Sequence, residues 1–349
     1  MNIGLVFHKD PLEAPTRIDL VRLRALGRAL LDHGWSVEIV APVRADGWID
    51  GLIPVRPLAC LDDPGRYALL KTCYHQSLGL IGAFQGPVAA RIVRVVDERL
   101  PERDEADRKR LLYFQEMILE RADALILNNQ ANADRWRSRY GARPPITLIP
   151  NGCPAILPLP GKNPYQTDQP IVLFLGSLAA PRMVHLLNDL AAAVHPRIQV
   201  HHLGRNVARL YGGSRYDILS PLIIQHGEVE EPGIWDYIRH ADVGLALATG
   251  PHAFDNDLSK VLSYLRGGLM VLSEENVLNN DLILAAGRGL VFAFGDVGDM
   301  SRRLDALLTS SPSAETHKND VARFVAEHHS WESRGRLLHD RLKSLVAMA

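Results

Sequence analysis

An apolar stretch, a polar loop, an amphipathic helix and a second apolar stretch lie between residues 241 and 273, and this unit constrains the fold most. Four apolar residues of the expected helix recur at helical spacing, namely Leu258, Val261, Leu262 and Leu265. Asp257 is its expected N-cap, and Gly267 with Gly268 is expected to end it. The runs 241–248 and 269–272 are the expected strands. Such a crossover joins parallel strands, so the sequence predicts an α/β protein.

Lys260 is expected in the first turn of this helix, beside the loop that leaves the upstream strand. Ligands of open α/β sheets bind at the carboxyl ends of the strands, and a helix N-terminus carrying a lysine suits a diphosphate. A solvated surface lysine fits the same local pattern, so both interpretations stay open at this stage.

The segment SKVLSYLRGGLMVLSE resembles the donor-site segment of GT-B glycosyltransferases. That pattern has proline or serine, lysine, two apolar residues, glutamate, tyrosine, leucine, a small-residue turn and a strand. Ser259, Lys260 and Tyr264 match it. Ser263 stands where many members have a glutamate that binds ribose or donor-sugar hydroxyls. The resemblance implies a donor-binding role for Ser259 and Lys260, and for Ser263 through its hydroxyl.

Length and composition are those of a soluble globular protein. The 349 residues suffice for two domains, with 47% hydrophobic and 23% charged residues. The net charge of −1 gives no support for nucleic-acid binding. The three cysteines show neither metal nor disulfide spacing, which is typical of a reducing cytoplasm. No leader segment or long apolar run is recognised, so a cytoplasmic location is expected.

Residues 1–153 are predicted to form an N-terminal Rossmann-like domain that binds the acceptor. The expected strands are 2–7, 36–41, 52–55, 91–96, 122–127 and 146–149, and the expected helices 18–31, 66–80, 104–121 and 132–140. The pieces ADALILNN, SRYG and ITLIPNG within 122–152 resemble the GT4-like group of GT-B enzymes, in which IPNG closes the first domain.

Residues 154–170 are rich in proline, glycine and asparagine and are the predicted linker. Residues 171–330 are predicted to form a second Rossmann-like domain that binds a nucleotide sugar, and 331–349 a helix that crosses back to the first domain. The expected strands of the second domain are 171–175, 198–203, 222–226, 241–248, 269–272 and 289–294, and its helices 181–193, 235–239, 257–266, 297–308 and 317–326. The predicted fold is GT-B, with two Rossmann-like domains facing each other across a cleft.

Candidate catalytic residues follow two of the expected strands in the first domain. Asp97 and Glu98 end the strand 91–96, and a carboxylate there would suit the base of an inverting sugar transfer. Adjacent residues of an extended chain point oppositely, so only one of the two can face a cleft. Capping of the next loop, or pairing with Arg99, is the other interpretation of these two residues. His8 lies in a polar loop without GxGxxG, where it is a third candidate or an ordinary loop residue.

Further donor-site candidates come from the resemblance. Gly176 and Arg182 lie in the opening of the second domain, where the family has a basic residue on the donor diphosphate. Gly227, Glu228 and Val229 match by position the turn that lies under the nucleotide base. A plain strand-to-helix turn is the other interpretation of these three residues.

The resulting hypothesis is a metal-independent glycosyltransferase that needs no cofactor and moves a sugar from a nucleotide diphosphate, UDP favoured, to a hydroxyl acceptor in glycan or exopolysaccharide synthesis. Two alternatives stay open: an inverting glucuronosyl-type enzyme with Asp97 as base, and a silent GT-B subunit that binds a sugar nucleotide or a partner protein. A lipid-linked or polymeric acceptor at the inner face of a membrane is a further hypothesis. It depends on the apolar residues 67–84 and the basic residues 108–110.

Overall fold

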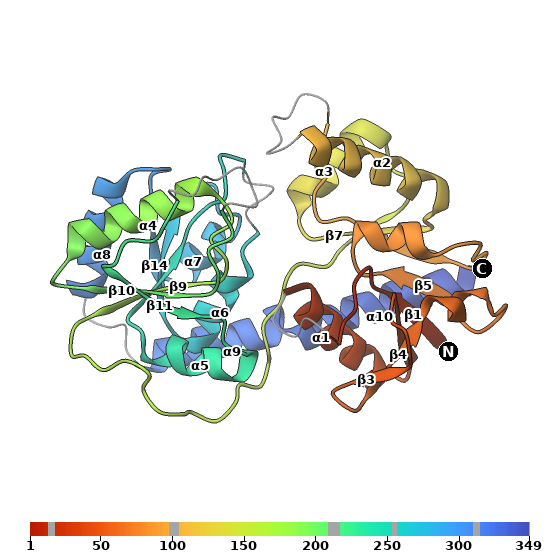
Figure 1. Cartoon of the computed structure of the whole chain (residues 1–349), viewed down its shortest axis with the longest axis horizontal. Helices are drawn as coiled ribbons and strands as arrows, with labels where there is room; N and C mark the ends of the chain where they lie inside the picture. Colours follow the sequence, from red (N-terminus) through yellow and green to blue (C-terminus); the bar gives the residue numbers. More distant parts are fainter. Residues whose placement is uncertain (13–17, 98–104, 209–216, 253–256, 310–314, 349) are drawn as a thin grey trace. The chain divides into compact units, whose positions relative to one another are not determined.

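The computed structural model describes residues 1–12, 18–97, 105–208, 217–252, 257–309 and 315–348. The chain divides into two compact units (Figure 1). The first consists of Met1–Gly152 with Trp331–Ala349, and the second of Cys153–Ser330. Each unit has its own sheet and its own hydrophobic core.

The sheet of the first unit has eight strands in the order β3-β4-β2-β1-β5-β6-β7-β8. Neighbouring strands are parallel, except for the antiparallel pair β3 and β4. Their bounds are β1 Asn2–Val6, β2 Ser36–Ala41, β3 Gly47–Ile49, β4 Ile53–Pro57, β5 Leu69–Thr72, β6 Val88–Arg91, β7 Ala124–Leu127 and β8 Ile146–Leu148. The parallel arrangement places the carboxyl ends of β1, β5, β6 and β7 along one edge.

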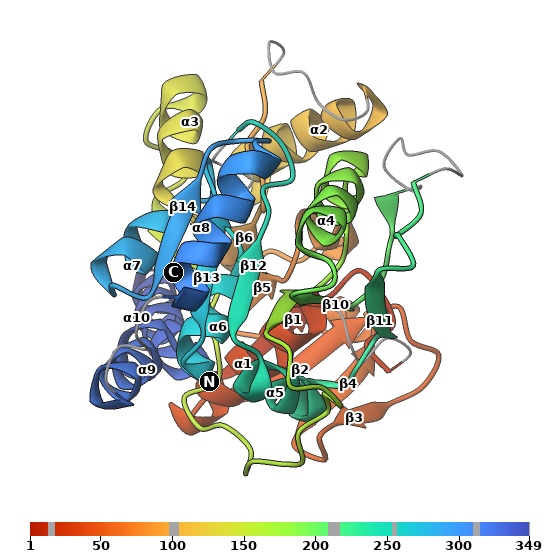
Figure 2. The same cartoon turned by 90° about the vertical axis from the view of Figure 1, so that its left-hand side faces the viewer.

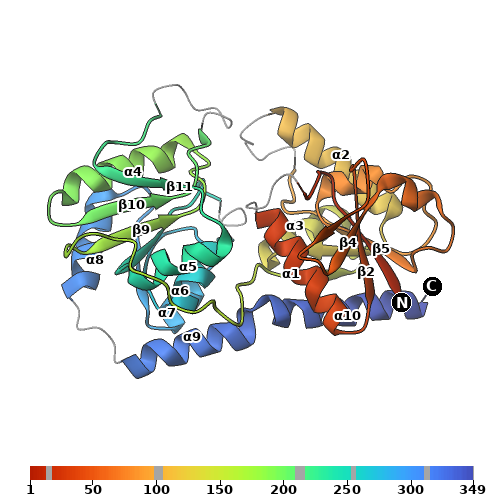
Figure 3. The same cartoon turned by 60° about the horizontal axis from the view of Figure 1, so that its bottom comes forward.

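Helices cover both faces of this sheet. Helices α1 (Ile18–Asp32) and α10 (Trp331–Met348) pack side by side on one face (Figure 3). A Cβ atom on Gly335 would lie only 2.2 Å from the Cβ of Ala29, which shows how closely these helices approach. The other face carries α2 (Glu105–Arg121), α3 (Gln130–Tyr140) and the 3₁₀ helix η2 (His75–Leu80). A short 3₁₀ helix η1 (Leu58–Asp62) follows β4.

The sheet of the second unit has six parallel strands in the order β11-β10-β9-β12-β13-β14. The strands are β9 Ile171–Leu175, β10 Gln199–Leu203, β11 Ile223–Gly227, β12 Val243–Ala246, β13 Met270–Glu274 and β14 Gly289–Phe292. Helices α4 (Pro181–Val194) and α8 (Val297–Thr309) cover one face (Figure 2). Helices α5 (Glu231–His240), α6 (Ser259–Gly267) and α9 (Glu315–His329) pack on the other, and α7 (Asn280–Ala285) lies beside β14.

Two predicted elements of the first unit are wrong. Residues 66–80 form β5 and η2 rather than one helix. Leu69 and Leu70 are both fully buried because a central parallel strand is covered on both faces, and such a continuous apolar run also satisfies a helical pattern. The predicted strand 91–96 is in fact β6, Val88–Arg91, and Asp97 lies in the loop that follows it.

The membrane hypothesis depended on residues 67–84, several of which lie in the core of the first unit, and on residues 108–110, which lie on α2. Tyr67, Leu78 and Ile81 of the apolar segment are buried in the core of the first unit. On α2, Arg108 and Lys109 pair with Glu105, and Arg110 pairs with Asp107. The positive charges of this run are therefore matched by carboxylates one turn away. No helix in the described ranges is long and apolar enough to cross a membrane.

Candidate functional site

Three glycines mark the carboxyl ends of neighbouring strands in the second unit. Gly176 follows β9 with φ +99°, Gly204 follows β10 with φ +145°, and Gly227 ends β11 with φ +71°. A Cβ atom on Gly204 would lie 2.4 Å from the carbonyl oxygen of Gly176, so a side chain cannot be accommodated there. A Cβ atom on Gly227 would meet nothing within 4 Å, so the backbone is open there, whereas Gly204 packs on Gly176.

Lys260 lies at this edge, in the first turn of α6. Its Nζ is 3.8 Å from the centre of the Phe174 ring, and it would lie 3.8 Å from a Cβ atom on Gly176. Burial of the ammonium group lowers the pKa of Lys260 to about 7. No described carboxylate forms an ion pair with it, so an anion placed beside Gly176 would restore the charged form. Lys260 thus lies in the first turn of α6 near Gly176, and its role as a donor ligand stays a prediction.

Tyr264 holds α6 in this position. Its buried hydroxyl accepts a hydrogen bond from the Leu175 amide (2.8 Å) and donates toward the carbonyls of Leu173 (3.1 Å) and Leu245 (3.2 Å). Gly244 of β12 provides the space, since a Cβ atom there would lie 2.4 Å from the tyrosine ring. One side chain thus ties the helix that carries the lysine to two central strands.

The start of α6 differs from the prediction at one residue. Leu258, not Asp257, is the N-cap, and its own side chain forms no capping hydrogen bond. The Leu258 amide instead donates to Asn279 Oδ1 at 2.8 Å, which fixes the entry of the chain from outside the helix. Ser259 is the first helical residue, and the Ser263 hydroxyl lies 3.5 Å from the Ser259 carbonyl oxygen. Because they are four residues apart, the two serines lie on the same side of the helix.

Arg182, the other predicted cation of this edge, lies in a different environment. Its guanidinium forms a bidentate ion pair with Glu274, with Nη1 3.0 Å from Oε2, and also donates to the Ala248 carbonyl. The Phe294 ring centre lies 4.1 Å from its guanidinium carbon. The charge of Arg182 is thus neutralised within the protein.

Glu274 is fully buried and connects several strand ends. Besides Arg182 it accepts hydrogen bonds from the amides of Ala248 and Gly295, both at 2.8 Å. The end of β13 and the loops after β12 and β14 are therefore joined to α4 through a single carboxylate. Sequence reasoning missed Glu274, although an acidic residue at the end of an expected strand is the same signal that singled out Asp97.

The turn 227–229 follows β11. Glu228 Oε1 lies 3.1 Å from Arg205 Nε, and Val229 packs against the core beside Gly233. On the neighbouring strand, His202 Nε2 lies 3.0 Å from the Gly176 carbonyl oxygen, and burial lowers the pKa of His202 to about 4. A neutral imidazole therefore donates to the backbone next to Lys260.

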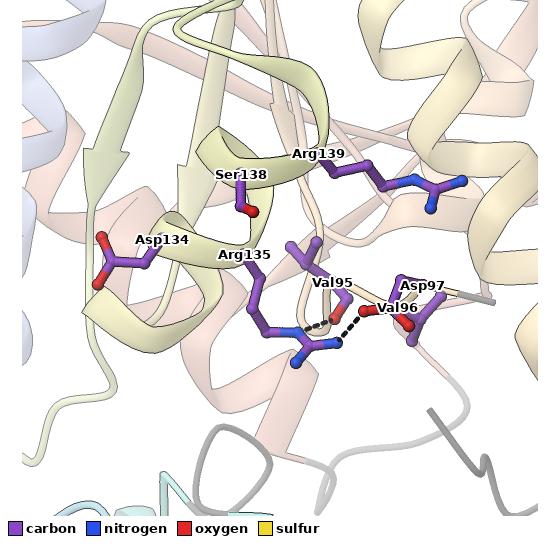
Figure 4. Close-up of a pocket in the computed structure, with 7 residues that line it drawn as sticks. All are labelled: Val95, Val96, Asp97, Asp134, Arg135, Ser138 and Arg139. Carbon is purple, nitrogen blue, oxygen red and sulfur yellow. Dashed lines mark hydrogen bonds and ion pairs between the residues drawn. The ribbon is translucent and has the colours of Figure 1, made fainter. Parts of the chain in front are cut away.

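The candidates of the first unit follow β1 and β6. The His8 ring stacks on Tyr74 with 5.2 Å between ring centres. Asp97 Oδ2 lies 3.1 Å from Arg135 Nη2, and the Arg135 Nε donates to the Val95 carbonyl at 3.0 Å (Figure 4). Glu98 lies outside the described residues.

Asp97 lines a hollow of about 440 Å³ (Figure 4). Its other lining residues are Val95, Val96, Asp134, Arg135, Ser138 and Arg139. The hollow combines two arginines, two carboxylates and a hydroxyl, a set that can hydrogen-bond a polar molecule such as a sugar. The described ranges contain no cluster of three or more histidine, cysteine or acidic side chains that could hold a metal ion.

Two α/β units with these sheets make up the GT-B fold, as the sequence predicted. Sucrose-phosphate synthase from Thermosynechococcus elongatus is similar over 100% of both chains, with a TM-score of 0.76 and 17% identity. HepE from Anabaena, solved in complex with UDP-glucose, gives a TM-score of 0.74 at 15% identity over 99% of this chain and 100% of its own. WaaG, a glycosyltransferase involved in lipopolysaccharide biosynthesis, gives 0.68 at 13% identity over 98% and 99%.

At such identities the similarity shows the fold alone. No family model matches the sequence, and no curated protein matches it.

Proposed function

We propose that this protein is a glycosyltransferase that takes a sugar from a nucleotide diphosphate donor, UDP favoured, and transfers it to a hydroxyl acceptor. The donor binds at the carboxyl edge of the second sheet. The Lys260 ammonium contacts the diphosphate, and the backbone at Gly176 and at 227–229 receives the nucleotide. The acceptor binds to the first unit, and transfer needs no divalent metal.

The observation that carries this proposal is the environment of Lys260. A lysine that has lost hydration and has no described carboxylate partner is stabilised when an anion binds, and a diphosphate supplies two negative groups. The open backbone at Gly176 allows the phosphates to approach. The HepE complex, with the same fold and UDP-glucose bound, supports UDP as the nucleotide.

Arg182 does not take part as a ligand in this proposal. The ion pair with Glu274 occupies its guanidinium, and we assign it the role of fixing the loops around the donor. Glu228, engaged with Arg205, fixes the turn 227–229 in the same way.

The test is calorimetric titration of UDP, GDP, ADP and TDP into wild type, Lys260→Ala and Lys162→Ala. A charge-assisted hydrogen bond contributes roughly 1.5–3 kcal/mol, so Lys260→Ala should weaken UDP binding about ten-fold or more. Lys162 lies exposed in the linker, and its replacement should change nothing. An absence of binding and of any melting-temperature shift at millimolar nucleotide would refute the donor site.

Asp97 is the proposed base if the transfer inverts the anomeric carbon, because its carboxylate lines the hollow of the first unit and Arg135 fixes its orientation. The anomeric configuration of the product, read by NMR, tests this assignment. A retained configuration would remove the need for such a base.

Ser263, which stands where the family pattern has a glutamate, favours a second candidate function, a silent GT-B subunit that binds a sugar nucleotide or a partner protein. Slow hydrolysis of a nucleotide-sugar panel without acceptor, in the presence of EDTA, separates the two. An enzyme releases free sugar from one of the donors, whereas a silent subunit binds the nucleotide and leaves every donor intact.

A further inference from the structure

The carboxyl ends of β1, β5 and β6 in the first unit carry a group of cationic and aromatic side chains. His8 follows β1, Tyr74 and His75 follow β5, and Arg91 ends β6. These three strands are neighbours in the sheet and parallel, so their ends lie together. Ligands of α/β sheets bind at such an edge.

His75 has an unusual environment within this group. Its side chain is only 3% exposed, and neither ring nitrogen has a hydrogen-bond partner in the described structure. The ring lies between those of Tyr74 and Phe114, at centre distances of 4.4 and 5.1 Å. Burial, followed by the charges of Arg110, His8, Arg91 and Arg94, lowers the pKa of His75 to about 3. A neutral imidazole with an unsatisfied N–H is costly unless something accepts from it.

The arginines near His75 come from two elements: Arg91 and Arg94 from the end of β6 and the loop after it, and Arg110 from α2. The buried Arg91 donates to the Cys73 carbonyl at 2.8 Å and to Asn128 Oδ1 at 3.3 Å. Arg94 Nη1 lies 3.9 Å from Asp107 Oδ2, and Arg110 pairs with the same carboxylate. Asp107 thus faces two arginines.

Further contacts complete the surroundings of the group. The charge of Asp19 on α1 also acts on Tyr74, whose ring lies 5.9 Å from the Arg91 guanidinium carbon. Three arginines and His8 therefore lie near enough to act on His75 through their charge, with two carboxylates in the neighbourhood, and an anion would be attracted to this edge.

We propose that this edge binds a phosphate group carried by the acceptor, with His75, Arg91 and Arg94 as its ligands. Donors that come from two neighbouring strand ends suit the three oxygens of a phosphate better than a planar carboxylate. The proposal rests on the proposed function, because it gives the chemical class of the acceptor: a hydroxyl compound that is also a phosphate monoester. A soluble sugar phosphate and a phosphorylated lipid headgroup share this chemistry.

The test uses the full chain with Lys260→Ala, so that the proposed donor site does not itself take up the probe. Inorganic phosphate, a hexose 6-phosphate and the unphosphorylated hexose are titrated while the histidine Cε1–H signals are followed by NMR. Both phosphates should shift the His75 signal, and the plain hexose should not. Vesicles with and without phosphatidic acid form the second arm, and binding confined to the former identifies a lipid source.

Variants assign the ligands. Arg94→Gln should weaken phosphate binding about ten-fold or more, because a charge-assisted bond is lost. Arg24→Gln is the matched control, since Arg24, on α1 of the same unit, is a partly exposed arginine that pairs with Asp50. Arg94→Lys keeps the charge and should recover part of the affinity, which guards against misfolding of the glutamine variant.

An unshifted His75 signal, or equal phosphate affinity in Arg94→Gln and wild type, would overturn the inference. UDP titration into the protein with Lys260 intact is recorded in parallel. If UDP binds and phosphate does not, only the acceptor class is wrong. If UDP fails to bind, the proposed donor site fails independently.

Discussion

Cationic side chains lie at the carboxyl edges of both sheets, but they differ in whether a carboxylate of the protein pairs with them. In the second unit, Arg182 is neutralised by Glu274, while Lys260 lies over Phe174 with no described carboxylate partner. In the first unit, Arg91 donates to neutral oxygens, and Arg94 shares one carboxylate with Arg110. The difference teaches that residue type and position along a strand do not identify a ligand-binding cation. A cationic side chain is available to a ligand only where no carboxylate of the protein already forms an ion pair with it.

The largest expected effect is a loss of stability in acid that is greater in the second unit than in the first. His201 and His202 of the second unit have their pKa values lowered by burial to about 4, from an unfolded value of about 6.5. The unfolded chain binds more protons in this range, so their contribution is complete above pH ~6.5 and is lost as the pH falls toward ~4. At about 1.4 kcal/mol per pKa unit, the loss amounts to several kcal/mol.

Hydrogen exchange between pH 7 and 4 checks this unit by unit. The second unit should lose protection first, because His75 is the one histidine of the described first unit for which burial is shown to lower the pKa in this way. His201→Gln should flatten the pH dependence, whereas the exposed His33→Gln should leave it unchanged. Simultaneous loss of protection in both units would break the comparison.

Glu274→Ala tests whether the pairing of Arg182 is structural. The substitution leaves a partly buried guanidinium and two backbone amides without their acceptor. Because a quarter of the Arg182 side chain is exposed (25%), the expected loss lies at the lower end of the range for buried pairs, roughly 3 kcal/mol. Urea unfolding measures it.

Glu120→Gln, at an exposed glutamate of α2, is the control for removal of a carboxylate. Glu274→Gln keeps the shape and one acceptor oxygen, so it should cost less than the alanine variant. A Glu274→Ala protein as stable as wild type would show that Arg182 is available for ligands after all.

The smallest expected effect concerns the charge of Lys260. With a pKa of about 7 in the free protein, Lys260 is largely neutral at pH 8, and a bound diphosphate raises its pKa. UDP binding above pH 7 should therefore take up a proton, and affinity should fall by up to about ten-fold, or ~1.4 kcal/mol, per pH unit.

Titrations from pH 7 to 9 in two buffers of different ionisation enthalpy count this proton. Lys260→Arg is the matched variant, because its guanidinium stays charged and should abolish the pH dependence. Proton uptake that persists in the arginine variant would assign the titration to another group.

Sequence reasoning succeeded where local signals agree. The strands Ser36–Ala41 and Ile171–Leu175 were predicted to the residue, because apolar runs lie between clear turns. The prediction was wrong for residues 66–97, because an apolar run that is covered on both faces fits a helical pattern and a strand pattern equally well. Burial is a property of the assembled sheet, and the local sequence does not contain it.

The same limit applies to the candidate site. Lys260 could be located because the crossover unit fixes its place at a strand end. The ion pair of Arg182 could not be predicted, because its partner Glu274 is 92 residues away along the chain. The orphaned nitrogens of His75 are likewise visible only after Tyr74 and Phe114 have packed around the ring.

Tyr264 has a consequence for changing this protein by design. Its hydroxyl holds α6 against two strands from the buried side. The position of the helix therefore does not depend on the side chains of its partly exposed face. Ser259 and Ser263 occupy that face and share one weak hydrogen bond. Substitutions at these two positions should therefore leave α6 and Lys260 in place, which makes them the positions at which to vary the preference of the proposed donor site.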